Sequence, residues 1–227
     1  PHYDLPGGHM LARIEKSRCM VFGCRYWLDG HETVRLFRYF DSQVQRRVSG
    51  TGVVVTTVTD GVLEVEMLDF APLNPCLSLV CRVLSVRNLT DREITGISLL
   101  YVLTSSTPWP CVSWSDGTLT VNDREAMHGV LVHAPGTRVE DSGGLFSGEL
   151  EEGWQSLGLS TALVSLPPGG SHQAWLAVVP LLVAGDPEQE AAIATLGSFA
   201  PMEALERTAA SWAMWNSQVA FRSDSHV

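Results

Sequence analysis

The sequence has little charge, and most of that charge is negative. Only 18% of its 227 residues are Asp, Glu, Lys or Arg, and the formal net charge is -10. Proteins that bind nucleic acids need clustered Lys and Arg side chains opposite the phosphates. Here the basic clusters are short, with Arg46-Arg47 adjacent and Arg35 and Arg38 nearby. The composition therefore argues against a nucleic-acid-binding protein.

Long apolar runs are also missing. The longest run, residues 174–184, is shorter than the roughly 20 residues that cross a bilayer, and Pro180 interrupts it. We therefore expect no membrane span. The first residues do not resemble a signal peptide. Gly7-Gly8-His9-Met10 is typical of a cloning scar, so residues 1–10 are predicted to be a tag or a disordered lead.

Cysteine is scarce, and its number is odd: the chain has five. Cys19 and Cys24 lie five residues apart, as do Cys76 and Cys81. An odd offset places two side chains on opposite faces of a strand, so neither pair forms a disulfide easily. We expect buried free thiols, which are typical of a reducing compartment, and hence a cytoplasmic protein.

Motifs for metal, phosphate or acyl-transfer chemistry are absent as well. His128 and His133 fall on opposite faces of one predicted strand, and the cysteine spacings do not match a zinc site. Residues 50–52 form a single glycine pair without a following lysine. Residues 158–162 resemble a nucleophile elbow but lie inside a predicted strand. We therefore expect neither a metal nor a cofactor.

What the sequence does contain is a strongly β-forming stretch from residue 53 to residue 103. Val53–Thr59 is almost entirely β-branched, and Asp60-Gly61 is a strong hairpin signal. Leu63–Met67 alternates between apolar and polar residues. Leu77–Asn88 is apolar on both faces, as in a strand covered on two sides, and the chain returns through Ile94–Thr104. The pattern predicts antiparallel hairpins.

The rest of the chain extends this pattern and then changes. Residues 134–153 are rich in glycine and acid and predict a long surface loop with at most one short strand. Helices are predicted from Asp186 to Gly197 and from Pro201 onward. The second carries an apolar stripe of Met202, Leu205, Ala209, Trp212 and Val219. The further predicted strands are 11–16, 18–28, 33–40, 43–48, 112–114, 119–121, 127–133, 157–166 and 171–179.

Strands followed by helices exclude a doubly wound fold. We predict a mainly β protein, with a large antiparallel two-sheet sandwich over residues 11–184 and a helical linker, residues 185–227, packed on it. The number of strands is too large for one small sandwich.

Several short motifs occur in an order that resembles a known family. They are Leu68-Asp69-Phe70-Ala71-Pro72, Cys81-Arg82-Val83, residues 86–91, Pro167-Pro168-Gly169-Gly170 and Trp212-Ala213-Met214-Trp215. The order resembles the N-terminal β-supersandwich domain of glucoamylase-like glycoside hydrolases of family 15, with trehalases and glucodextranases as relatives. The resemblance implies a galactose-mutarotase-like supersandwich with two C-terminal helices.

The resemblance also implies where catalysis resides. In the family, the catalytic glutamates belong to an (α/α)6 barrel, which would follow residue 227, so no catalytic residue is carried over to this chain. The leading hypothesis is a non-catalytic domain that packs against such a barrel, on the same or another chain. The alternative is a stand-alone carbohydrate-binding or assembly module that binds oligosaccharide. A third hypothesis is an independent enzyme.

Few residues are candidates for a site of their own. An independent glycosidase would need two carboxyl groups, and the candidates are Asp69 and the acidic run Glu149, Glu151 and Glu152. We favour a solvated loop for the run, and for Asp69 the capping of a turn or a pair with an arginine.

The tryptophans provide the other candidates. Exposed indole rings can stack on sugars, although most tryptophans anchor loops to a core. Trp109, Trp114 and Trp154 are the predicted carbohydrate contacts. Trp212 and Trp215 are predicted to lie at a domain interface, packed against the sandwich or against a partner helical domain. Asn88-Leu89-Thr90 matches the glycosylation sequon, and we interpret it as a turn.

Overall fold

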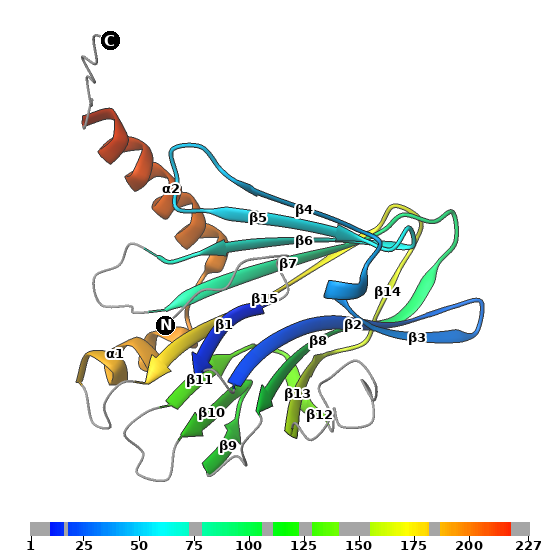
Figure 1. Cartoon of the computed structure of the whole chain (residues 1–227), viewed down its shortest axis with the longest axis horizontal. Helices are drawn as coiled ribbons and strands as arrows, with labels where there is room; N and C mark the ends of the chain where they lie inside the picture. Colours follow the sequence, from blue (N-terminus) through cyan, green and yellow to red (C-terminus); the bar gives the residue numbers. More distant parts are fainter. Residues whose placement is uncertain are drawn as a thin grey trace.

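The computed structural model describes residues 10–15, 18–72, 79–105, 111–122, 129–140, 155–181 and 187–218. These residues form fifteen β-strands, one 3-10 helix and two α-helices. The strands pair antiparallel and form two sheets. The predicted mainly β, two-sheet antiparallel fold is confirmed (Figure 1).

The first sheet has seven strands and is built around two long ones, β2 (Arg18–Leu28) and β8 (Ile94–Ser105). β1 (Met10–Glu15) and β3 (His31–Leu36) pair with opposite halves of β2. β13 (Gln155–Thr161) and β14 (Val164–Leu166) pair with opposite halves of β8. β12 (Thr137–Glu140) pairs with β13 and forms an edge.

The second sheet has eight strands in one continuous order. From edge to edge they are β4 (Ser42–Arg47), β5 (Val54–Thr59), β6 (Leu63–Phe70), β7 (Val80–Asn88), β15 (Ser171–Leu181), β11 (Gly129–His133), β10 (Thr118–Asn122) and β9 (Cys111–Ser115). β7 is therefore an inner strand, as its apolar composition predicts.

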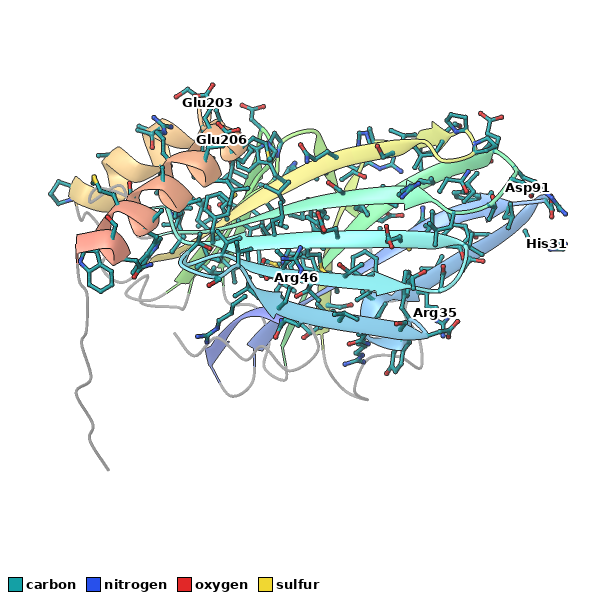
Figure 2. All side chains as sticks on the ribbon, turned by 90° about the horizontal axis from the view of Figure 1, so that it is seen from above. His31, Arg35, Arg46, Asp91, Glu203 and Glu206 are labelled. Carbon is teal, nitrogen blue, oxygen red and sulfur yellow. The ribbon has the colours of Figure 1, made fainter. Side chains whose placement is uncertain are left out.

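Alternation of side chains along the strands divides the core between the two faces of the eight-stranded sheet. On β7, Leu84 and Val86 face the other sheet and join the main core, which Phe22 and Tyr101 enter from β2 and β8. Val83 faces the opposite way and joins a second core with α1 (Pro187–Leu196) and α2 (Pro201–Gln218). The helices therefore form a third layer, at the left of Figure 1 and above the sheet in Figure 2.

The Asp-Gly dipeptides turn the chain as predicted. Asp29-Gly30 has φ angles of 52° and 79°, and Asp116-Gly117 has 46° and 74°. Two consecutive positive φ angles define the hairpin turn whose twist matches the flanking strands. At the third dipeptide, Asp60 Oδ1 accepts hydrogen bonds from the backbone N–H groups of Val62 and Leu63.

Two predicted strands are shorter than expected. The strand predicted at 33–40 ends at Leu36, and a 3-10 helix, η1 (Phe37–Tyr39), follows. Phe37 and Phe40 enter the core edge to face, which turns the chain from the first sheet to the second. The strand predicted at 157–166 is split at residues 162–163, because β13 and β14 pair with different halves of β8.

Helix α2 buries a slightly different stripe from the predicted one. Ala204 and Thr208 are buried, whereas Met202 remains 38% exposed. The stripe is thus centred about one position from the prediction, and Val219 lies outside the described residues. In the described part of the chain, no helix combines the length and apolar character needed to cross a membrane.

Candidate functional site

A buried ion pair joins Asp69 on β6 to Arg82 on β7. The two residues are cross-strand partners, and Arg82 donates from Nε to Asp69 Oδ1 at 2.6 Å and from Nη2 to Oδ2 at 2.5 Å. The Arg82 guanidinium also lies 4.4 Å from the centre of the Phe22 ring on the other sheet. Asp69 therefore pairs with an arginine, as the sequence analysis favoured.

Among the described residues, this pair is enclosed inside the sandwich. Arg82 is fully buried, and the side chain of Asp69 is 8% exposed. The neighbouring Tyr101 is fully buried, and burial raises the pKa of its phenol, with Arg82 opposing the shift. The contact fixes β6, β7 and β2 together, which is a structural role.

The predicted domain-interface tryptophans lie on α2. Their rings meet edge to face with centroids 5.5 Å apart. Trp212 lies over the turn before β5, where a Cβ on Gly52 would come 2.7 Å from its Nε1 atom. Asn216 Nδ2 donates to the backbone oxygen of Gly50 at 2.8 Å. These contacts attach the C-terminal half of α2 to the hairpin between β4 and β5.

Beyond that contact, the same end of α2 presents apolar side chains to solvent. Trp215 is 53% exposed and Met214 is 62% exposed. On the outer face of the helix, Glu203 and Glu206 point away from the sheet (Figure 2). The exposed apolar end of α2, which we define as Met214 and Trp215, is therefore distinct from the acidic face of the helix.

The predicted sugar-stacking tryptophans are not brought together by the described residues. Trp114 lies on β9, partly buried against the main core. β9 is the edge strand opposite β4, so Trp114 and Trp212 are at opposite edges of the eight-stranded sheet. Trp109 and Trp154 lie outside the described residues, as does the acidic run Glu149, Glu151 and Glu152. Their sugar-binding role stays a prediction.

A polar cluster that the sequence analysis missed lies on the seven-stranded sheet. The Arg25 guanidinium on β2 contacts Glu32 on β3 and Glu140 on β12, 115 residues away. Burial opposes ionisation of Glu140, but hydrogen bonds from Ser160 and Arg25 outweigh it and lower its pKa. A general acid needs a raised pKa, so Glu140 is unsuited to protonate a glycosidic oxygen. The indication in the sequence was the position of Arg25 on its strand: its neighbours Cys24 and Tyr26 enter the main core, so Arg25 points outward.

Two further observations concern other chemistries. Within the described ranges, no three His, Cys, Asp or Glu side chains gather closely enough to hold a metal ion. Asn88 of the sequon is fully buried, and its Nδ2 donates to the backbone oxygens of Arg92, Leu166 and Pro167. The sequon is thus a structural turn, as predicted.

No family model matches the sequence, and no curated protein matches it. Solved structures do match the fold. A protein assigned as a kojibiose phosphorylase from the human microbiome has a TM-score of 0.54 and 9% identity, and the match covers 92% of this chain and 30% of that one. A bacterial glucoamylase complexed with acarbose has a TM-score of 0.54 and 8% identity, covering 96% and 34%.

An assigned aldose 1-epimerase from Escherichia coli K12 has a TM-score of 0.46 and 9% identity, covering 70% of this chain and 79% of that one. The chain spans about a third of the length of the first two structures. At these identities the likeness shows the fold alone. The protein is a mainly β, two-sheet antiparallel sandwich with two helices after the last strand.

Proposed function

We propose that this chain is a non-catalytic sandwich domain of a glucoamylase-like glycoside hydrolase, and that a separate helical domain performs the hydrolysis of α-glucosidic bonds. Two proteins with names of carbohydrate-active enzymes share the fold over nearly all of this chain but only about a third of their own. The part of each of those proteins that lies outside the match is large enough for a second, catalytic domain.

The exposed apolar end of α2 carries the proposal. Large apolar side chains grouped on one helix end are uncommon on a surface that meets only water, and they mark contact sites for other proteins. Trp215 and Met214 are each more than half exposed, next to a Trp212 that is already held by the sandwich. In the proposal, a helical catalytic domain covers Trp215 and Met214, so the sandwich and that domain form one enzyme.

The electrostatics of the carboxylates support a non-catalytic role. Asp69 is committed to Arg82 inside the core. Glu140 has a lowered pKa and a guanidinium partner. Inverting and retaining glycosidases both need a protonated carboxyl group beside the scissile bond. The lowered pKa of Glu140 does not meet that requirement, and Asp69 is enclosed with Arg82 in the core.

The proposal is tested first by the mass of the natural gene product. A product much heavier than the 24.7 kDa of this chain is expected. A photo-crosslinking amino acid at position 215 should then link to a helical segment, whereas the same substitution at Glu206 should not. A natural product of about 25 kDa that forms no crosslink from position 215 contradicts the proposal.

A second test measures activity. The chain alone should release no glucose from maltose, and the natural product should release it. Release by the chain alone would favour an independent enzyme. If the chain neither hydrolyses sugar nor crosslinks but binds maltooligosaccharides through Trp109, Trp114 or Trp154, the stand-alone binding module is the better assignment.

The proposal includes a reducing location such as the cytoplasm. Cys24 and Cys81 are free and buried, and burial raises the pKa of both thiols, with Asp60 and Asp69 adding to the respective shifts. Native protein should therefore react with thiol reagents at these two positions only after unfolding. Mass spectrometry of the alkylated natural product checks this, and a disulfide at either position would contradict it.

A further inference from the structure

One edge of the eight-stranded sheet is formed by β4, and this edge is open to solvent. In the described part of the chain, β4 pairs with β5 on one side and with no strand on the other. All six residues of β4, Ser42–Arg47, are exposed. In an antiparallel edge strand, every second residue directs its N–H and C=O groups away from the neighbouring strand. The edge therefore presents backbone donors and acceptors to another extended chain.

Positive charge is concentrated along this edge. Four arginines contribute to it: Arg35 on β3, Arg38 on η1, and Arg46 and Arg47 on β4. We name these four residues the arginine edge. Asp41 is the one acidic residue between positions 35 and 47, so four positive charges less one negative charge leave this segment at +3. The whole chain has a formal charge of -10, so the arginine edge opposes the overall sign.

The arginine edge begins where the chain enters β4. Gln43 Nε2 donates a hydrogen bond to the backbone oxygen of Arg38 at 3.2 Å, so η1 lies beside the first residues of β4. Arg35 Nη2 lies 3.5 Å from Asp41 Oδ1, and both side chains are solvent-accessible. An exposed ion pair of this length is weak. The guanidinium of Arg35 therefore remains able to exchange Asp41 for another carboxylate.

The far end of β4 is also positive and has no acid opposite it. Arg46 and Arg47 are exposed, and their cross-strand partners on β5 are Val55 and Val54. Between the two charged ends, the side chain of Val44 is 60% exposed. Figure 2 shows Arg35 and Arg46 apart along this edge of the sheet. An added strand can thus pair acids with both ends and an apolar side chain with the middle.

The sign of the charge distinguishes between possible occupants. Charged side chains on an edge strand commonly prevent pairing with another edge. A second copy of this chain would bring a second arginine edge against the first, and like charges facing each other are destabilising. An extended acidic segment would instead gain pairs of opposite charge in addition to the backbone hydrogen bonds of a new strand.

We infer that the edge of β4 is a docking site for an extended acidic segment of a partner protein, which adds a strand to the eight-stranded sheet. Backbone hydrogen bonds supply the affinity, and the arginine edge with Val44 supplies the selectivity. This docking site is separate from the exposed apolar end of α2. It can therefore be present whether or not the proposed function is correct.

The direct test titrates the whole chain, labelled with 15N, with a short peptide and follows the backbone amide signals of residues 42–47 by NMR. The probe is a capped peptide with two glutamates at each end and Thr-Val-Thr-Val between them. Saturable shifts centred on residues 42–47 are expected. Amide exchange should also slow at every second residue of β4, because outward N–H groups become hydrogen-bonded to the peptide.

Two altered peptides separate strand addition from simple attraction between charges. The first has lysine in place of every glutamate, and it should bind at least about tenfold more weakly because the arginine edge repels it. The second keeps every glutamate but is methylated on the backbone nitrogens of its four central residues. It loses the donors that a new strand needs, so it should also bind at least about tenfold more weakly.

Variants of the chain locate the charge that selects the peptide. Arg46→Gln combined with Arg47→Gln should weaken binding of the glutamate peptide at least about tenfold. The matched control combines Arg87→Gln with Arg92→Gln, which removes the same charge from two exposed positions on β7 and the turn after it. At physiological ionic strength these distant charges are screened, so the control should bind as the unmodified chain does.

Several results would overturn the inference. They are the absence of shifts at millimolar glutamate peptide, equal binding of the lysine or the methylated peptide, and shifts centred away from residues 42–47. Tighter binding of oligothymidylate than of the glutamate peptide would assign the arginine edge to a nucleic acid. A dimer that forms through β4 in sedimentation would make a second copy the occupant. The first measurement uses the unmodified chain, so a variant that fails to fold leaves the test intact.

Discussion

Arg82 and Asp69 face each other across β6 and β7 and share two hydrogen bonds inside the sandwich. Removing one partner of a buried ion pair leaves an uncompensated charge, which costs about 3–5 kcal/mol. Asp69→Asn should therefore lower the free energy of unfolding by about that amount in urea denaturation. Asp91→Asn, at a side chain that is 94% exposed, is the control and should change it little.

The same pair allows a second comparison. Replacing both charges with apolar residues, as in Asp69→Leu with Arg82→Met, should recover much of the stability lost in Asp69→Asn, because no buried charge then remains. A double variant less stable than Asp69→Asn would show that the pair contributes more than mutual neutralisation.

The extent to which the sequence predicted these features differs between fold and site. Alternation in Leu63–Met67 and the Asp-Gly turns follow from local chemistry, so both were predictable. The partner of Asp69 was not, because the register between β6 and β7 is set by tertiary pairing. The Arg25–Glu140 contact depends on strand order across four strands, which no local pattern encodes.

Asn88 connects two turns that are far apart in the sequence. Its Nδ2 group lies 3.0 Å from the Leu166 oxygen and 3.1 Å from the Pro167 oxygen. Asn88→Ala leaves the buried Leu166 carbonyl without this donor and should cost about 1–3 kcal/mol. Asn216→Ala, which loses one bond at an exposed site, should cost less. Equal losses in thermal denaturation would contradict the structure.

Gly52 has no room for a side chain beneath Trp212. A Cβ would lie 2.7 Å from the indole nitrogen, so Gly52→Ala must displace the ring or the helix. Overpacking of this kind costs about 1–3 kcal/mol. Gly197→Ala is the matched control, since nothing lies within 4 Å of its added atom. We expect Gly52→Ala alone to lower stability and alter tryptophan fluorescence; unchanged values would contradict the contact.

His133 should make stability depend on pH. Its ring lies 5.5 Å from that of Trp175, and burial lowers its pKa below the ordinary 6.5. The folded state thus favours the neutral ring. The contribution of His133 to the free energy of unfolding is therefore fully present above pH 6.5 and is lost as the pH falls toward the lowered pKa. The loss is about 1.4 kcal/mol for each unit of lowering.

His133→Gln is expected to flatten this pH dependence in urea denaturation between about pH 7 and pH 5. His172→Gln provides the comparison, because its side chain is not in the buried set. If the stability of the His133→Gln variant keeps the original slope against pH, the pH dependence comes from other groups.

The long pairing of β2 with β8 constrains how the chain is made. Partners in this pair are separated by 68 residues, from Trp27 to Thr95, up to 87 residues, from Arg18 to Ser105. At about 5–20 residues per second, a ribosome takes roughly 4–17 s to supply the missing strand. During that interval Met20 and Phe22 of the nascent β2 have no complete core to pack into. The protein is therefore expected to need chaperone protection early in synthesis.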